Sequence, residues 1–273
     1  MSELRRSTNR SLLGSWNRKS LFMDGKLGIL DWGIGGIGVH KLIKERRPKL
    51  SVVYFSDTGV TPYGKMSRAE LVARLNLVIG YLKTKGVSHL VIGCNAASTV
   101  IPFLDPQGLK IEGIIDAAVE MSAKLKPTRL GLIGGRRTIL SMVYRKAFGI
   151  RGINVEQRIA QPLSGSIESG DTSSEKLLQE CKKILAPLKN CSHILLACTH
   201  YPAIIPTMTP IVSEQTAFID PAEELAKRTA PWRLSSGAGD RFYTSGDVRG
   251  MTLAAANAFG VAIRNVRSIT INK

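Results

Sequence analysis

Two of the four cysteines in this sequence stand where a reactive thiol is expected. Cys94 and Cys198 each follow a short aliphatic run typical of a buried strand, and each precedes a helix-like segment. At such a transition, unpaired backbone N–H groups and the helix dipole stabilise a thiolate relative to a thiol. An unperturbed thiol has a pKa of about 8.5, so modest tuning suits it to acid or base chemistry. Cys181 and Cys191 lack this setting and are interpreted as small buried hydrophobes.

The segments that contain the two cysteines are repeated. The run SHLVIGC at 88–94 reappears as SHILLAC at 192–198. A second echo, LGIL at 27–30 and LGLI at 130–133, has almost the same spacing. Two echoes in one register indicate an internal duplication. Two equivalent thiols on two related units then imply one shared cleft.

A thiolate and a thiol on opposite sides of one carbon can invert its configuration. One group removes the proton beside a carboxylate from one face, and the other delivers a proton to the opposite face. The two roles exchange when the substrate has the opposite handedness. The cysteine pair therefore predicts proton transfer at a stereocentre.

Aliphatic runs alternate with helix-like segments along the chain. This alternation predicts an α/β fold of two pseudo-symmetric, doubly wound parallel-sheet domains with the active site between them, beyond the carboxyl ends of the strands. Strands are predicted at 27–31, 51–55, 89–93, 111–115, 129–133, 153–158 and 193–197. Helices are predicted at 36–46, 67–85, 117–125, 137–147, 174–187, 221–228 and 247–260.

Composition narrows the function classes. The formal net charge is +17, but the basic residues are spread along the chain and carry no nucleic-acid-binding motif, so nucleic acid is not expected as the primary ligand. No apolar run approaches the roughly 20 residues that cross a membrane. Without a C-x-x-C pair, neither a zinc site nor a disulfide framework is expected, which favours a reduced, cytoplasmic setting. Residues 1–24 are interpreted as a basic, disordered extension.

A glycine-rich segment, Asp31-Trp32-Gly33-Ile34-Gly35-Gly36, follows the first predicted strand. Its spacing is not the G-x-G-x-x-G of dinucleotide-binding loops, so it predicts a nucleotide site only weakly. Its backbone amides suit a carboxylate equally well. A simple tight turn is the third interpretation.

Taken together, these motifs resemble glutamate racemase, within the aspartate/glutamate racemase superfamily. The resemblance covers about residues 27–260 and includes FSDT at 55–58, PYG at 62–64, CNAAS at 94–98, CTHYP at 198–202 and YTSGD at 243–247. It implies a first domain of residues 25–117 with 229–273, a second of residues 118–228, and an amino-acid substrate held between them. The resemblance also implies that the protein can form a homodimer. No pyridoxal phosphate, metal or nucleotide is expected, and the implied role is supply of D-glutamate for peptidoglycan.

The resemblance also assigns roles to individual residues. Cys94 and Cys198 would be the acid/base pair, with Asp31 assisting Cys94 and with Glu168 and His200 assisting Cys198. The implied substrate-binding residues are Asp31, Trp32, Pro62, Tyr63, Gly64, Asn95, Ala96, Thr138, Thr199 and His200.

Two positions depart from the family pattern. The family has serine where this chain has Trp32, and threonine where it has Ala96. Both changes remove a hydroxyl from the expected pocket, and a site loses discrimination when such groups vanish. Thr138 follows a loop, 134–137, that is also unusual for the family. Two alternatives therefore stay open: a racemase of another acid, such as aspartate or a hydantoin, and a non-catalytic binding protein derived from a racemase, with Trp32 filling the cleft.

Overall fold

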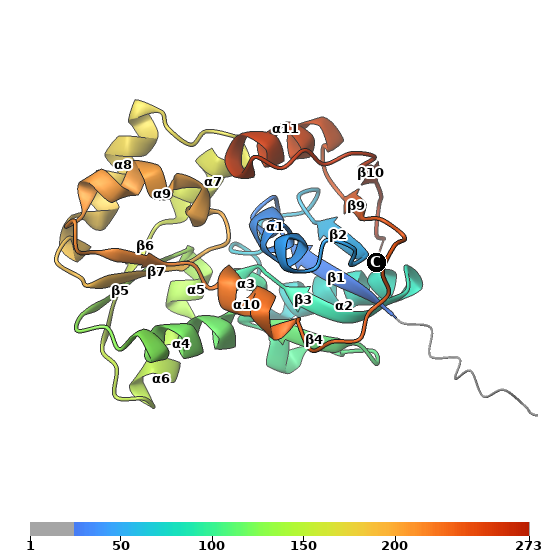
Figure 1. Cartoon of the computed structure of the whole chain (residues 1–273), viewed down its shortest axis with the longest axis horizontal. Coiled ribbons are helices and arrows are strands. Elements are labelled where there is room, and N and C mark those ends of the chain that lie inside the picture. The colour runs from blue at the N-terminus through green and yellow to red at the C-terminus, as the bar shows by residue number, and fades with distance from the viewer. Residues whose placement is uncertain (1–24, 273) are drawn as a thin grey trace, which may run out of the picture.

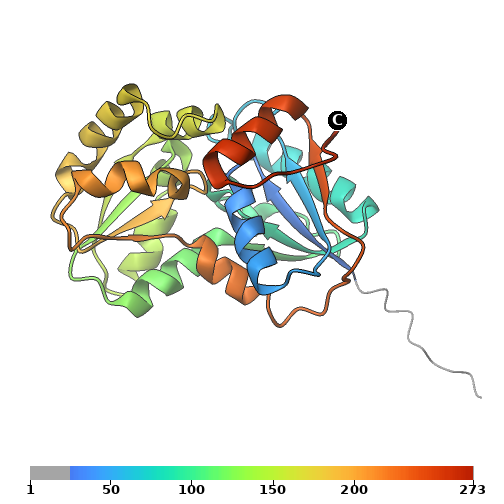
Figure 2. The ribbon, with the colours of Figure 1, turned by 45° about the horizontal axis from the view of Figure 1, so that its top comes forward.

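The computed structural model describes residues 25–272, which form two lobes side by side, each built on a parallel sheet (Figure 1). The basic extension predicted at residues 1–24 lies outside the described residues. In the turned view of Figure 2 the two sheets are again separate, and helices cover them. The predicted pair of parallel-sheet α/β domains is confirmed.

The first sheet has the strand order β10-β9-β2-β1-β3-β4, and all its neighbours are parallel. Its strands are β1 (Lys26–Asp31), β2 (Val52–Ser56), β3 (Val87–Ile92), β4 (Lys110–Gly113), β9 (Arg241–Thr244) and β10 (Arg267–Ser268). The strands β1 and β2 are buried along almost their whole length, as expected for a sheet covered on both faces.

The second sheet has the order β6-β5-β7-β8 and is also parallel throughout. Its strands are β5 (Leu130–Gly134), β6 (Val155–Ile159), β7 (His193–Ala197) and β8 (Ala217–Ile219). This order repeats β2-β1-β3-β4 of the first sheet, with β5 in the place of β1 and β7 in the place of β3. The duplication predicted from the sequence is therefore a repeat of topology, and β3 and β7 are the equivalent strands that precede the two cysteines.

Helices cover the sheets. They are α1 (Gly36–Arg46), α2 (Arg68–Thr84), α3 (Asn95–Ser98), α4 (Ile114–Leu125), α5 (Arg136–Leu140), α6 (Val143–Gly149), α7 (Gln161–Glu168), α8 (Glu175–Leu185), α9 (Ile205–Met208), α10 (Ala222–Arg228) and α11 (Val248–Phe259). Side chains fix several of their starts: Ser67 and Glu70 form a capping box at α2, and Asp247 accepts from two backbone N–H groups at α11.

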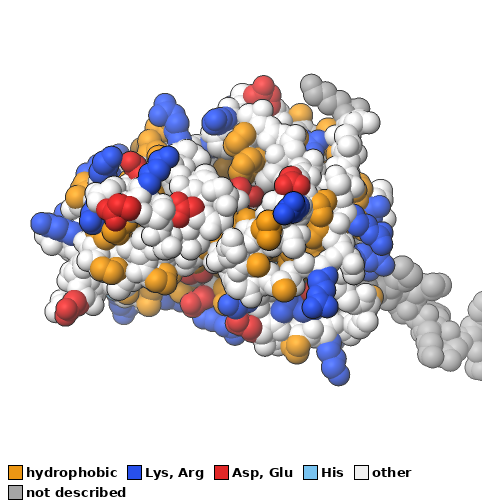
Figure 3. Space-filling view, turned by 90° about the horizontal axis from the view of Figure 1, so that it is seen from above, with side chains coloured by type: hydrophobic (Ala, Val, Ile, Leu, Met, Phe, Trp, Pro, Cys, Tyr) orange, Lys and Arg blue, Asp and Glu red, His pale blue; other side chains and the backbone are white. Residues whose placement is uncertain are grey.

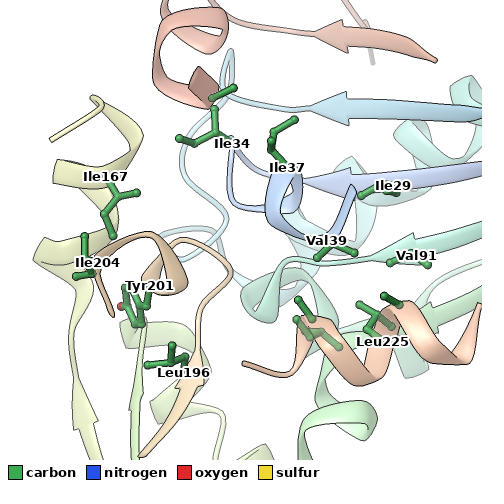
Figure 4. Packing of buried hydrophobic residues seen from close by; sticks show 14 of the residues in the cluster. Ile29, Ile34, Ile37, Val39, Val91, Ile167, Leu196, Tyr201, Ile204 and Leu225 are labelled. Carbon is green, nitrogen blue, oxygen red and sulfur yellow. The ribbon is translucent and has the colours of Figure 1, made fainter. Parts of the chain in front are cut away.

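A single hydrophobic cluster reaches from one sheet to the other. Ile29, Ile37 and Val91 belong to the first sheet and its helix α1, whereas Leu196 and Tyr201 belong to the second (Figure 4). Helix α10 packs against both α1 and α4, so it joins the lobes on one side. The domain limits near residues 117 and 228 stay predictions, because α10 contacts helices of both lobes.

The prediction of one helix over 137–147 is wrong. The chain forms α5 and α6 instead, separated at Met142, whose φ of 60° is left-handed. The Ser141 hydroxyl donates to the Thr138 carbonyl and accepts from Val143 N–H, so it competes with the helical hydrogen bonds. No range was predicted for the helices α3, α7 and α9 or for the strands β8, β9 and β10.

Within residues 25–272, no helix is long and apolar enough to cross a membrane. All four cysteines are described, and all four are free thiols. Lys and Arg side chains lie on both lobes of the face in Figure 3, with Asp and Glu among them.

Candidate active site

The functional side chains come from the carboxyl ends of strands in both sheets, where a parallel fold binds its ligands. They surround a cavity of about 300 Å³. Both sulfurs line this cavity: Cys94 follows β3 and Cys198 follows β7. Of the predicted site residues, the cavity is lined by Asp31, Trp32, Pro62, Tyr63, Gly64, Cys94, Asn95, Ala96, Thr138, Cys198, Thr199 and His200. Glu168 stands behind His200.

Cys94 is buried at the start of α3, with 8% of its surface exposed. Burial raises the pKa of its thiol well above the usual value, and the negative charges of Asp31 and Cys198 raise it further. Backbone N–H groups of Ala97 and Trp32 oppose this shift. The balance favours a protonated Cys94 at neutral pH, which is the form that donates a proton.

Cys198 lies in a chain of contacts with an imidazole and a carboxylate. Its sulfur is 3.6 Å from His200 Nδ1, and His200 Nε2 is 2.6 Å from Glu168 Oε2. Burial alone would lower the pKa of His200, but its hydrogen bonds to Cys198 and Glu168 and their charges raise it well above the ordinary value. A cationic His200 donates from both ring nitrogens, and its charge lies beside the Cys198 sulfur.

Asp31 ends β1 on the floor of the cavity and is fully buried. Thr199 donates its hydroxyl hydrogen to Asp31 Oδ2 at 2.8 Å, so a residue beside Cys198 touches the carboxylate whose charge raises the pKa of Cys94. Burial raises the pKa of Asp31, and this outweighs the lowering by His200 and Thr199. A carboxyl of raised pKa exchanges protons more readily with a thiol nearby.

The glycine-rich segment lies where the second lobe comes closest to the first. A Cβ on Gly33 would stand 2.0 Å from Glu168 Oε2, and one on Gly35 would stand 2.3 Å from Thr199 Oγ1. Ile34 N–H donates to Glu168 Oε2 at 2.9 Å. The loop amide therefore binds a carboxylate, as one sequence interpretation held, but the carboxylate belongs to the protein itself.

Asn95 lines the cavity and has an unused hydrogen-bond donor. Its Oδ1 accepts from Tyr144 Oη at 2.6 Å, whereas its Nδ2 is buried and has no hydrogen-bond partner among the described residues. A buried donor without a partner is costly, so the site is incomplete without an acceptor at this position. A substrate carboxylate or carbonyl would satisfy it.

Trp32 lines the cavity without closing it. The indole is partly exposed, and its Nε1–H donates to the Val60 carbonyl at 3.3 Å. Ala96 follows Asn95 on α3 and also lines the cavity. Thr138, in α5, is buried at 2% exposure beside them.

Several contributors were missed at the sequence level, and Asp57 and Arg137 are two of them. Asp57 is buried behind the cavity and accepts from Tyr63 Oη at 2.6 Å, so it fixes the loop that carries Tyr63 and Gly64. Arg137, from α5, lines the cavity directly. The unusual loop before Thr138 was the only sequence signal for Arg137. Among the described residues, no group of His, Cys, Asp and Glu side chains is placed to hold a metal ion.

Comparison with known proteins places this geometry in a family. The model of the Asp/Glu/hydantoin racemase family matches residues 38–229, which include both site cysteines and the second sheet. The chain belongs to this family. It is therefore an isomerase of the amino-acid racemase class.

Two relatives and one solved structure illustrate the match, and each is named as a glutamate racemase. A glutamate racemase of Bacillus cereus is 28% identical over 90% of this chain and 97% of its own length. A glutamate racemase of Caldanaerobacter subterraneus is 33% identical over 73% of this chain and 75% of its own. The crystal structure of glutamate racemase from Francisella tularensis with D-glutamate matches with a TM-score of 0.82 at 23% identity, over 91% of this chain and 98% of the other.

Proposed function

We propose that this racemase interconverts L-glutamate and D-glutamate by proton transfer between two cysteines, without an organic cofactor or a metal. The observation that carries the proposal is that Cys94 and Cys198 end equivalent strands of the two sheets and line one cavity. The curated relatives named as glutamate racemases support the choice of substrate. In the cell we propose a cytoplasmic supply of D-glutamate for peptidoglycan, as the family resemblance implies.

The resting protonation states follow from the electrostatics of the site. Cys94 is the thiol, because burial and Asp31 raise its pKa. We assign the role of the base to Cys198, whose sulfur lies 3.6 Å from Nδ1 of the cationic His200. One enantiomer loses its α-proton to Cys198, and the carbanionic carbon takes a proton from Cys94 on the opposite face. Each turnover thus leaves Cys198 protonated and Cys94 as a thiolate, the state that accepts the other enantiomer.

Neighbouring groups reset the pair. Asp31, with its raised pKa, can give a proton to Cys94 and regain one from solvent in the cavity, while Cys198 can release its proton to solvent. One proton enters at Cys94 and one leaves from Cys198, so the two exchanges restore the resting state. Asn95 Nδ2 and the N–H groups at the start of α3 are the donors we assign to the substrate carboxylate.

The open cavity supports catalysis rather than a plugged cleft. About 300 Å³ remains beside the Trp32 indole, which is within the range of small-ligand pockets. Trp32 and Ala96 favour a second candidate, in which the same chemistry acts on a different acid, because both replace hydroxyl-bearing residues that the resemblance expects.

Deuterium incorporation at the α-carbon in heavy water tests the proposal. The wild-type protein should exchange the α-proton of both glutamate enantiomers, and Cys94→Ala or Cys198→Ala should lower racemisation by about 10²-fold or more. Cys191→Ala is the matched control, since that buried thiol lies away from the cavity. Failure of the wild-type protein to exchange either enantiomer would contradict the proposal.

A further inference from the structure

A second cavity adjoins the catalytic one. It measures about 680 Å³, is lined by both lobes, and shares Gly64 and Arg137 with the catalytic cavity. We call it the basic annex, defined by the side chains of Arg68, Arg136, Arg137 and Lys146.

The basic annex has positive charge without a counter-charge. No Asp or Glu lines it, and none of its four cationic side chains forms an ion pair with a described residue. Elsewhere in the described chain the partly buried cations Arg74 and Arg228 both pair with carboxylates. An anion entering the annex would therefore supply the missing charge.

Arg137 stands at the junction of the two cavities. Its Nε donates to Thr99 Oγ1 at 3.1 Å and its Nη1 donates to the Met66 carbonyl at 2.7 Å, so both partners are neutral and belong to the first lobe. Burial and the nearby charge of Arg68 lower its pKa. A guanidinium has five N–H groups, and these two bonds leave others for a bidentate contact with an acid group.

The annex also has apolar walls. Phe103 and Leu140 are 53% and 57% exposed there, and the Arg68 guanidinium lies over the Phe103 ring at 4.8 Å. Methylene groups can pack on these surfaces while an acid group reaches the cations. Basic and apolar walls together fit the end of a flexible acidic side chain better than a bare inorganic ion.

We propose that the basic annex is a substrate subsite, and that this racemase acts on α-amino acids whose side chain carries an anionic group farther from the α-carbon than glutamate does. Arg137 holds the distal acid group at the junction, and Arg136 and Lys146 extend the subsite for longer or more highly charged groups. The inference rests on the proposed two-cysteine reaction and changes only the substrate that it prefers.

The test compares acids of increasing length in the same exchange assay. The series is aspartate, glutamate, α-aminoadipate and the phosphonate analogue of α-aminoadipate, with glutamine as the neutral comparison. We expect kcat/KM to be higher for α-aminoadipate or the phosphonate than for glutamate by about tenfold, the worth of one charge-assisted contact. Equal or lower values for both long acids would overturn the proposal.

The double variant Arg136→Ala/Lys146→Ala localises the effect. Both side chains are exposed, so the fold should survive their removal. We expect KM for the phosphonate, the more highly charged of the two long acids, to rise about tenfold while KM and kcat for glutamate stay unchanged. Lys176→Ala/Lys182→Ala, which removes two exposed cations from α8, is the matched control and should change neither. An equal loss for short and long acids would contradict a subsite.

Two further outcomes separate this proposal from the proposed function. Exchange of glutamate without binding of long acids by calorimetry would overturn the annex alone. Exchange of long acids but not glutamate would overturn glutamate as substrate and support the annex.

Inorganic phosphate provides a separate test of the annex. Phosphate that binds the annex without competing with the long acids would identify a free-anion site and overturn the substrate subsite.

Discussion

In the proposed reaction, His200 is the residue on which the chemistry of Cys198 depends. It lies between the sulfur of Cys198 and the carboxylate of Glu168, and its two ring nitrogens are committed to these neighbours. The first domain contributes to the same arrangement, because the backbone of Ile34 holds Glu168 in place. A change at Glu168 therefore acts on Cys198 through the imidazole.

Glu168→Gln should lower the pKa of His200. The carboxylate now raises that pKa by its charge and its hydrogen bond, and glutamine keeps the shape but removes the charge. The imidazolium would then be lost at a lower pH, so the alkaline fall of racemisation should move to lower pH. An NMR titration of His200 alongside the pH–rate profile measures both effects. Glu180→Gln on α8 is the control, and unchanged profiles in both variants would contradict the role of Glu168.

At the scale of elements, Asp57 ties four segments together. It follows β2 and accepts from Tyr63, from Arg74 on α2 and from Ser245 after β9. The same Arg74 donates to the Ile271 carbonyl, so the last described residues also depend on it. The loop that carries Tyr63 into the cavity is thus positioned by a buried ion pair.

Asp57→Asn should destabilise the fold by about 3–5 kcal/mol, because it leaves Arg74 largely buried without its counter-charge. Urea unfolding followed by circular dichroism measures the free energy of unfolding. Glu156→Gln breaks the exposed pair with Arg129 and should have no measurable effect. A loss for Asp57→Asn no larger than that of the control would show that the pair does not hold these segments.

Periodicity and strand-end placement were enough to predict most elements and the two thiols. The signals near Cys94 and Cys198 are local in sequence, and the duplicated runs give both sheets. The break at Met142 escaped prediction because it depends on a hydrogen bond of the Ser141 side chain. Arg137 and Asp57 also escaped, since their importance lies in contacts with residues distant in the chain.

At the scale of the whole molecule, side-chain hydrogen bonds close the two lobes around the cavity. Thr199 reaches Asp31, Tyr144 reaches Asn95, and Arg137 reaches Met66. Each bond joins a residue of the second sheet's lobe to one of the first. Together with the shared hydrophobic cluster, they hold together the two lobes that contribute Cys94 and Cys198 to the cavity.

Tyr144→Phe should weaken this closure. Removing the hydroxyl leaves buried Asn95 Oδ1 without a partner, which costs about 1–3 kcal/mol of stability. The freed amide can rotate, so KM for the amino acid should rise more than kcat falls. Thermal unfolding and steady-state kinetics measure the two effects, and Tyr81→Phe in the first lobe is the control. A loss of stability with KM unchanged would place Asn95 outside the substrate contacts.

The first sheet is completed by residues that come after the entire second sheet in the chain, because β9 pairs with β2. A ribosome therefore releases the second lobe while β2 is still an open edge with unpaired backbone groups. Such an edge invites pairing with other nascent chains until residues 241–244 emerge. Premature termination before β9 should consequently yield aggregates rather than a weakened enzyme.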